Sequence, residues 1–196
     1  MPGTYTVGMD IVEDGDVIAL TEPVAFDAKL LQHATLPAKD FAALVAFQKE
    51  VSELSRVMAG TQRLAQELTG KLGAIKKALI QTPEADVQLG TRVKELEEQL
   101  KDIQYALTGP QARASWEELQ PMQMPLNRRL STMTYTHWSS TSELTKTETD
   151  QLEILREEFP PVLSQLEQVV DEIRELDREL EALKAPWTPG RVPELN

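Results

Sequence analysis

The sequence predicts a mainly α protein: a long, coiled-coil-like antiparallel bundle of three to four helices with a small N-terminal β-hairpin or partial sheet. Two observations lead to this class. Apolar residues recur with a seven-residue period over most of the chain after residue 37, whereas they alternate with a period of two before residue 31. A seven-residue period is typical of helices that pack along one seam, and a period of two is typical of strands.

Residues 1–34 are expected to form the β-hairpin. Asp14-Gly15 is a strong signal for a tight turn between two antiparallel strands. The extended segments around this turn cover residues 5–7, 9–12, 17–20 and 24–30. Because two or three strands make a poor independent sheet, this segment needs the helices, another chain or further sequence to cover it.

Residues 35–185 are expected to form the helical bundle, and residues 186–196 an extended C-terminal tail. The first helix runs from about Ala38 to Gln81, the second from Thr82-Pro83 to Gly109-Pro110, and the last from Thr145, where Glu148 completes a capping box. A shorter helix is expected at about 125–138, with Leu126, Leu130 and Met133 as its apolar residues.

The seam of the bundle is read directly from the repeat. Its first part consists of Leu44, Phe47, Val51, Leu54, Met58, Thr61, Ala65, Leu68, Leu72, Ile75 and Leu79. The second helix contributes Leu89, Val93, Leu96, Leu100, Ile103 and Leu107. The last contributes Leu152, Leu155, Phe159, Val162, Leu166, Val169, Ile173, Leu176, Leu180 and Leu183.

Glycine and proline test whether these repeats belong to continuous helices. Gly60, Gly70 and Gly73 each weaken a helix by up to about 1 kcal/mol relative to alanine, yet the repeat continues across them. Pro160 and Pro161 lie inside the last repeat, where proline removes a backbone hydrogen bond. We therefore expect one continuous first helix and one long last helix with a kink at the prolines.

Charge and length favour packing of the first helix against the last. Neither of these helices would be stable alone with its seam in water, and antiparallel packing is the simple solution. Residues 37–81 carry a net charge of +3 (seven bases, four acids) and residues 146–184 one of −7 (five bases, twelve acids). Flanking side chains of opposite sign can therefore pair across the interface.

Composition excludes several functions. The net charge of −12 argues against nucleic acid as a partner, because affinity for phosphates comes mainly from Lys and Arg. The absence of cysteine excludes disulfides, Cys-ligated zinc, iron–sulfur clusters and thiol nucleophiles. No apolar run approaches the roughly 20 residues of a membrane-spanning helix, so we expect no membrane insertion, and no signal peptide is visible in this chain.

No catalytic, cofactor-binding or metal-binding residue is predicted, and no cofactor is expected. The two histidines, His33 and His137, lack the Glu-x-x-His spacing of di-iron bundles, and no phosphate-binding loop or nucleophile motif is present. His137, Trp138 and Tyr135 would form a small polar–aromatic pocket or, as we prefer, anchor the short helix. A catalytic triad assembled from distant segments is not refuted by sequence, but we expect a non-enzymatic protein.

The acidic residues of the last helix have two readings. One is a surface for cations or a basic partner, and the other, which we favour, is a solvated face that keeps the bundle soluble. They are Glu153, Glu157, Glu167, Asp171, Glu175 and Asp177.

The expected partner is protein. The seam is compatible with an intermolecular coiled coil and hence with a homo-oligomer, but the short connection at Gln81–Thr82 favours folding back within the chain. The hairpin is the stronger candidate for an interaction, because an unfinished sheet presents edges that accept further strands.

Three segments carry a family resemblance. They are residues 2–7 (Pro-Gly-Thr-Tyr-Thr-Val), 126–130 (Leu-Asn-Arg-Arg-Leu), and 186–191 (Pro-Trp-Thr-Pro-Gly-Arg) followed by Pro193. Together with the order of hairpin, long helices and terminal loop, they resemble the C-terminal region of bacterial sortilin-like, BNR-repeat "glycosyl hydrolase" β-propeller proteins. The resemblance covers nearly the whole chain, and none of its motifs is catalytic.

This resemblance implies that residues 1–34 are the end of a β-sandwich that follows the propeller. The propeller's Ser-x-Asp-x-Gly-x-Thr-Trp boxes are missing here, so the chain would not include the propeller. The glycosidase name is not carried over, because no matched position bears a catalytic role. The resemblance implies a periplasmic, cell-surface or secreted location, although a cytoplasmic one stays open. The expected function is a structural or protein-interaction module of an exported propeller-type protein. The alternatives are an accessory domain of a carbohydrate-active or peptidase-like enzyme, and a stand-alone coiled-coil scaffold.

Overall fold

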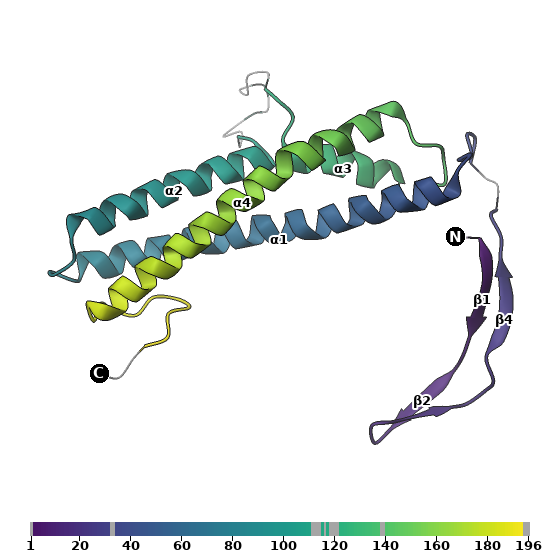
Figure 1. The fold of residues 1–196 in the computed structure, drawn as a ribbon, viewed down its shortest axis with the longest axis horizontal. Helices are drawn as coiled ribbons and strands as arrows, with labels where there is room; N and C mark the ends of the chain where they lie inside the picture. Colours follow the sequence, from purple (N-terminus) through teal and green to yellow (C-terminus); the bar gives the residue numbers. More distant parts are fainter. Residues whose placement is uncertain are drawn as a thin grey trace. The chain divides into compact units, whose positions relative to one another are not determined.

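The computed structural model describes residues 2–31, 34–110, 115, 117, 122–137 and 140–193. Within these residues the fold is mainly α, with four helices and a small antiparallel β-structure at the N-terminus, as predicted (Figure 1). The chain divides into two compact units. One comprises residues 1–49 and 137–144, the other residues 50–136 and 145–196.

The β-structure is one long hairpin made of two successive pairs of strands. β1 (Gly3–Val7) pairs antiparallel with β4 (Val24–Ala28), and β2 (Asp10–Glu13) pairs antiparallel with β3 (Asp16–Ala19). The backbone NH of Leu20 donates a 2.8 Å hydrogen bond to the carbonyl of Met9 between the two sheets. We call residues 3–28 the β-ribbon.

The turn of the β-ribbon lies at the predicted dipeptide. Asp14 and Gly15 have φ angles of 52° and 94°, in the left-handed region that hairpin turns of two residues require. Glycine adopts this region without strain, and aspartate tolerates it better than most residues. The turn sequence therefore sets the register that places Ile11 opposite Ile18 and Val12 opposite Val17.

In the remainder of the first unit, the segment that precedes the first helix forms hydrogen bonds with the segment that precedes the last helix. Ala38 NH donates to the carbonyl of Thr141 (3.1 Å), and Glu143 NH donates to the carbonyl of Leu36 (3.0 Å). In the same unit the ring of Phe47 meets that of His137 edge-on, with 5.5 Å between the centroids. These contacts connect the segment that precedes the first helix to the segment that precedes the last one.

The helices are α1 (Phe41–Ile80), α2 (Val87–Thr108), α3 (Leu126–His137) and α4 (Lys146–Ala182). α1 is continuous across its three glycines, which confirms the prediction of one long helix. α4 begins at the predicted capping box, in which Thr145 and Glu148 exchange hydrogen bonds with each other's backbone. It continues as a helix through Pro160 and Pro161, both of which are exposed.

The start of α2 differs from the prediction. Thr82 is not the N-cap, since its NH and hydroxyl donate to the carbonyls of Leu79 and Ala78 and so hold it in the last turn of α1. The N-cap is Asp86, whose carboxylate accepts a 2.9 Å hydrogen bond from the NH of Gln88. A threonine hydroxyl can satisfy a carbonyl four residues earlier as well as an amide ahead of it, and here the first option prevails.

The predicted seam residues form the core of the helices. On α1 all of them are buried except Leu54 and Leu79, which are half-buried, and on α4 all are buried except Leu183. All six predicted seam residues of α2 are buried, and so are Leu126, Leu130 and Met133 of α3. The core is therefore almost entirely aliphatic, which explains the low aromatic content.

The two long helices run in the same direction, not antiparallel as expected of them. Glu50 of α1 pairs with Arg156 of α4, and 21 residues further along both helices Lys71 pairs with Asp177. α2 lies antiparallel to α1, since Lys76 pairs with Glu97 while Thr69 contacts Gln104. The chain reverses through α2 and α3 before α4 begins, which returns it to the same end of the unit (Figure 1).

Candidate functional site

The β-ribbon has one apolar and one polar face in its β1–β4 half. Cross-strand pairing places Tyr5 opposite Phe26 and Val7 opposite Val24 on one face. Thr4 lies opposite Asp27 on the other face, where the threonine hydroxyl donates a 2.8 Å hydrogen bond to the carboxylate. The two faces differ because side chains alternate along a strand, and directly opposed residues share a face.

The apolar face of this half is exposed. The rings of Tyr5 and Phe26 stack with their centroids 6.0 Å apart, but the two residues remain 42% and 50% exposed. Val7 and Val24 are more exposed still. Ring stacking thus stabilises the pair within the β-ribbon, while about half of the surface of these two residues stays in contact with solvent.

The β2–β3 half exposes apolar side chains on both faces. The Ile11–Ile18 pair points to one side and the Val12–Val17 pair to the other, and all four residues are exposed. In the part of the chain that the structure describes, each strand of the β-ribbon pairs with one other strand only. Each strand therefore has an outer edge whose backbone groups are available to a further strand.

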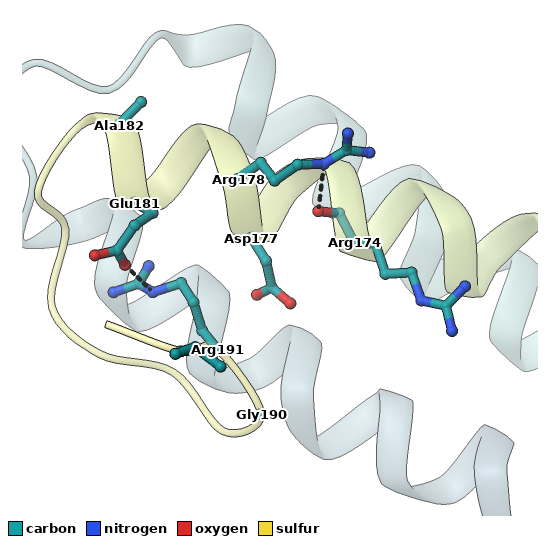
Figure 2. A pocket seen from close by; sticks show the side chains of 8 residues that line it. Arg174, Asp177, Arg178, Glu181, Ala182, Gly190 and Arg191 are labelled. Atoms are coloured by element: carbon teal, nitrogen blue, oxygen red, sulfur yellow. Dashed lines mark hydrogen bonds and ion pairs between the residues drawn. The ribbon is translucent and has the colours of Figure 1, made fainter. Parts of the chain in front are cut away.

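A pocket of about 500 Å³ lies at the C-terminal end of α4, between this helix and the segment that follows it (Figure 2). In Figure 2, Asp177 and Glu181 extend from α4 toward this segment, and Arg178 extends along the helix toward Arg174. We call residues 185–193 the tail. The pocket is lined by Arg174, Asp177, Arg178, Glu181, Ala182, Gly190, Arg191 and Val192.

Charged groups of this pocket pair within the protein. Asp177 forms an ion pair with Lys71 of α1, and both side chains are largely buried. The Nε atom of Arg191 lies 2.9 Å from a carboxylate oxygen of Glu181. Arg174 pairs with Asp171 one turn earlier. Asp177, Glu181, Arg174 and Arg191 thus each have an ion-pair partner within the protein, and the Nε of Arg178 donates to the carbonyl of Arg174.

The tail folds back onto α4. Arg191 is buried, and its Nη2 donates to the carbonyls of Ala185 (2.6 Å) and Pro186 (2.7 Å). The indole NH of Trp187 donates to the carbonyl of Arg191 (2.7 Å). Thr188 is completely buried. The guanidinium therefore binds carbonyls just beyond the C-terminus of a helix, where cations are favoured.

An apolar groove of about 610 Å³ lies beside the N-terminus of α3. It is lined by Pro110, Met122, Met124 and Pro125, together with residues of α2 and α3. Gly109 adopts a φ of 72°, and a Cβ atom there would lie 2.7 Å from the ring of Pro125. The glycine thus allows the close approach of the two loops that form the groove.

The sequence-predicted polar candidates are dispersed. The acidic residues named on the last helix are exposed, with the exception of Asp177, which pairs with Lys71. Tyr135 is 87% exposed, which contradicts a polar–aromatic pocket that encloses its ring. His33 and Trp138 lie outside the described residues. Among the residues that the structure does describe, no three His, Asp or Glu side chains are grouped to hold a metal ion.

Comparisons with known proteins leave the chain without a family assignment. No family model, curated protein or solved structure matches it. Within the described ranges, no helix is both long enough and apolar enough to cross a membrane.

Sequence reasoning missed three buried polar residues, Arg129, Thr188 and Arg191. Arg191 and Thr188 lie in a segment rich in proline and glycine that reads as an extended tail. Arg129 of α3 is also buried, where its Nη1 donates to Gln151 of α4 at 2.8 Å. The only available signal for Arg191 is its distance of ten residues from Glu181, which is too unspecific to use.

Proposed function

We propose that this chain is a non-enzymatic structural and protein-interaction module whose β-ribbon completes a β-sheet that lies outside this sequence. The observation that carries the proposal is the exposed apolar face formed by Tyr5, Val7, Val24 and Phe26. A two-stranded ribbon with such a face is marginally stable in water. Covering it with a further sheet stabilises it in proportion to the apolar area removed from solvent.

The open edges of the β-ribbon support sheet completion over other kinds of docking. Each edge presents backbone NH and carbonyl groups that hydrogen-bond to water when no strand is added. A partner strand satisfies these groups and places its side chains beside the exposed pairs Ile11–Ile18 and Val12–Val17. The helices have the complementary role: their aliphatic seam, which we regard as coiled-coil-like, forms a rigid body to which the β-ribbon is attached.

We further propose that the chain is the C-terminal part of an exported propeller-type protein, which would place it in the periplasm or at the cell surface. The resemblance of residues 2–7, 126–130 and 186–191 to that class supports this assignment. So does the chain order of β-ribbon, long helices and tail. In such a protein the β-ribbon would supply the last strands of the sandwich that follows the propeller.

The proposal of a non-enzymatic role is supported by the ion pairs and hydrogen bonds that the charged side chains of the tail pocket form within the protein. Lys71, Asp177, Glu181 and Arg191 bind one another or backbone carbonyls at the tail pocket. A general acid or base needs a proton-transfer group that is free to reach a substrate. We therefore assign these residues to stability.

The decisive experiment compares amide hydrogen exchange in the β-ribbon for the chain alone and for the chain with the polypeptide encoded directly upstream in its gene. We expect β1 and β4 to exchange quickly in the chain alone and to gain protection in the presence of the upstream polypeptide. A variant with Tyr5→Ser and Phe26→Ser should lose that gain. A control with Thr6→Ser and Ala25→Ser, on the opposite face, should keep it.

Two results would contradict the proposal. One is strong protection of the β-ribbon in the chain alone, because a self-sufficient ribbon needs no sheet to complete. The other is an upstream region without Ser-x-Asp-x-Gly-x-Thr-Trp repeats, which would refute the propeller-type parent while leaving the sheet-completion role to be judged by exchange.

A further inference from the structure

We propose that the sheet edge completed by the β-ribbon is basic: its strand alternates apolar residues with lysine or arginine. This inference rests on the proposed function, since it names the chemistry of the strand that the β-ribbon accepts. The docking surface is the apolar β-ribbon, and the negative charge around it favours an added strand with basic side chains.

The charged side chains in and next to the β-ribbon are almost all acidic. Described residues 2–31 contain one basic residue, Lys29, which lies beyond the end of β4. Against it stand six acidic residues, which are Asp10, Glu13, Asp14, Asp16, Glu22 and Asp27. The segment therefore carries −5 (six acids less one base), and no cation lies among residues 2–28. All six carboxylates are on exposed residues.

The pairing of β2 with β3 opposes like charges. Glu13 lies directly opposite Asp16 in the strand register, and Asp14 follows at the turn. Like charges directly opposite each other destabilise an antiparallel pair. A lysine or arginine on an added strand would relieve this repulsion while its apolar neighbours cover Ile11, Ile18, Val12 or Val17.

The same charge argues against a second copy of this chain as the occupant. Two β-ribbons that pair edge to edge would bring −6 against −6, since residues 3–28 hold six acids and no base, and like-charge juxtaposition opposes association. An acidic strand is disfavoured for the same reason. A basic strand is attracted at long range and also forms hydrogen bonds with the open backbone edge. The electrostatic attraction and the hydrogen bonds therefore both favour binding.

The test uses the full chain and two synthetic peptides of equal length, one alternating valine with lysine and the other alternating valine with glutamate. Binding is measured by calorimetry, and its position is mapped by hydrogen exchange of residues 3–28. We expect the lysine peptide to bind at least about tenfold more tightly than the glutamate peptide at low salt, and added salt to reduce the difference.

A matched pair of variants isolates the acids of the β-ribbon. The variant Asp10→Asn, Glu13→Gln, Asp16→Asn should lose most of the preference for the lysine peptide. A control with the same change in net charge, Glu84→Gln, Glu98→Gln, Glu167→Gln, alters exposed helix and loop positions and should retain it. Circular dichroism of both variants verifies that the helices remain folded.

Each result has a definite meaning. Equal protection of the β-ribbon by both peptides would overturn the basic edge but leave sheet completion standing. Protection by neither peptide would overturn the basic edge, and sheet completion would then depend on the exchange experiment with the upstream polypeptide. Protection outside residues 3–28 would assign the peptides to another surface and also overturn the inference.

Discussion

Arg191 holds the tail to the last helix through Glu181, with its Nε 2.9 Å from the glutamate carboxylate. The two residues are ten positions apart, and between them the chain leaves α4 and turns back. The guanidinium side chain is only 5% exposed, and its Nη2 also binds two backbone carbonyls. A single buried side chain therefore links the tail to α4 and to the backbone just beyond the end of that helix.

We predict that Arg191→Ala destabilises the protein by about 2–4 kcal/mol, because it leaves a largely buried carboxylate and two carbonyls without this donor. Arg191→Lys should recover only part of the loss, since an ammonium cannot form the same forked set of contacts. Urea unfolding monitored by circular dichroism gives the comparison. Arg174→Ala, at an exposed ion pair on the same helix, should cost less than about 1 kcal/mol. Equal losses at both positions would refute the role given to Arg191.

Leu166 tests the seam. It is 1% exposed on α4, so Leu166→Asp would bury a charge that has no partner in the aliphatic core. We expect a loss of about 4 kcal/mol or more, or failure to fold. Gln165→Asp places the same charge on the neighbouring exposed position and should cost less than about 1 kcal/mol. An unchanged melting temperature for Leu166→Asp would refute the bundle core.

Glu50 makes part of the stability depend on pH. Hydrogen bonds from Arg156, at 2.6 and 2.7 Å, together with its charge, lower the pKa of the Glu50 carboxyl below its usual value. A carboxyl whose pKa is lower in the folded state stabilises the protein above its unfolded pKa, and this contribution is lost as pH falls through the folded value. Both side chains are more than a third exposed, so the contribution is about 1 kcal/mol or less.

Glu50→Gln should therefore reduce stability at neutral pH and have little effect at a pH well below 4, where the wild-type carboxyl is protonated in both states. Gln66→Ala, at an exposed position elsewhere on α1, removes no titratable group and serves as the control. A constant difference between wild type and Glu50→Gln across the whole pH range would contradict the assigned pairing.

The glycines of α1 offer a stabilising change. A Cβ added at Gly60, Gly70 or Gly73 meets no atom within 4 Å, and none of the three has a positive φ. Alanine at each should raise stability by about 0.5–1 kcal/mol, because glycine loses more backbone entropy on folding. Gly109→Ala should do the opposite, since its φ is 72° and the new Cβ would overlap Pro125. Melting temperatures of the single variants decide both predictions.

Periodicity in the sequence was sufficient to predict the helical seam because burial of one face governs these helices. Leu96, Leu155 and Ile173, for example, are all 1% exposed or less. The direction of the long helices was beyond the sequence, since a seam pattern reads the same for parallel and antiparallel neighbours. The opposite net charges of the first and last helices agree with the Lys71–Asp177 pair, but the Glu50–Arg156 pair has the reverse polarity.

Local signals predicted the β-ribbon and failed for the tail. Asp14 and Gly15 specify a turn through their own backbone preferences, so the hairpin could be derived from two adjacent residues. Thr188 and Arg191 are buried only because the chain turns back onto α4, and that contact joins residues without a periodic relation. The exposure of Tyr5 and Phe26 was likewise a question of what covers the β-ribbon, and composition alone does not answer it.

The two prolines of α4 interrupt the series of backbone hydrogen bonds in this helix. Pro160 and Pro161 have no NH to donate to the carbonyls of Arg156 and Glu157, so two consecutive backbone hydrogen bonds of the helix are missing at an exposed site. The buried residues Phe159 and Val162 hold the two parts of the helix together there. Because cooperative opening spreads through contiguous hydrogen bonds, we expect the part of α4 before the prolines to open separately from the part after them.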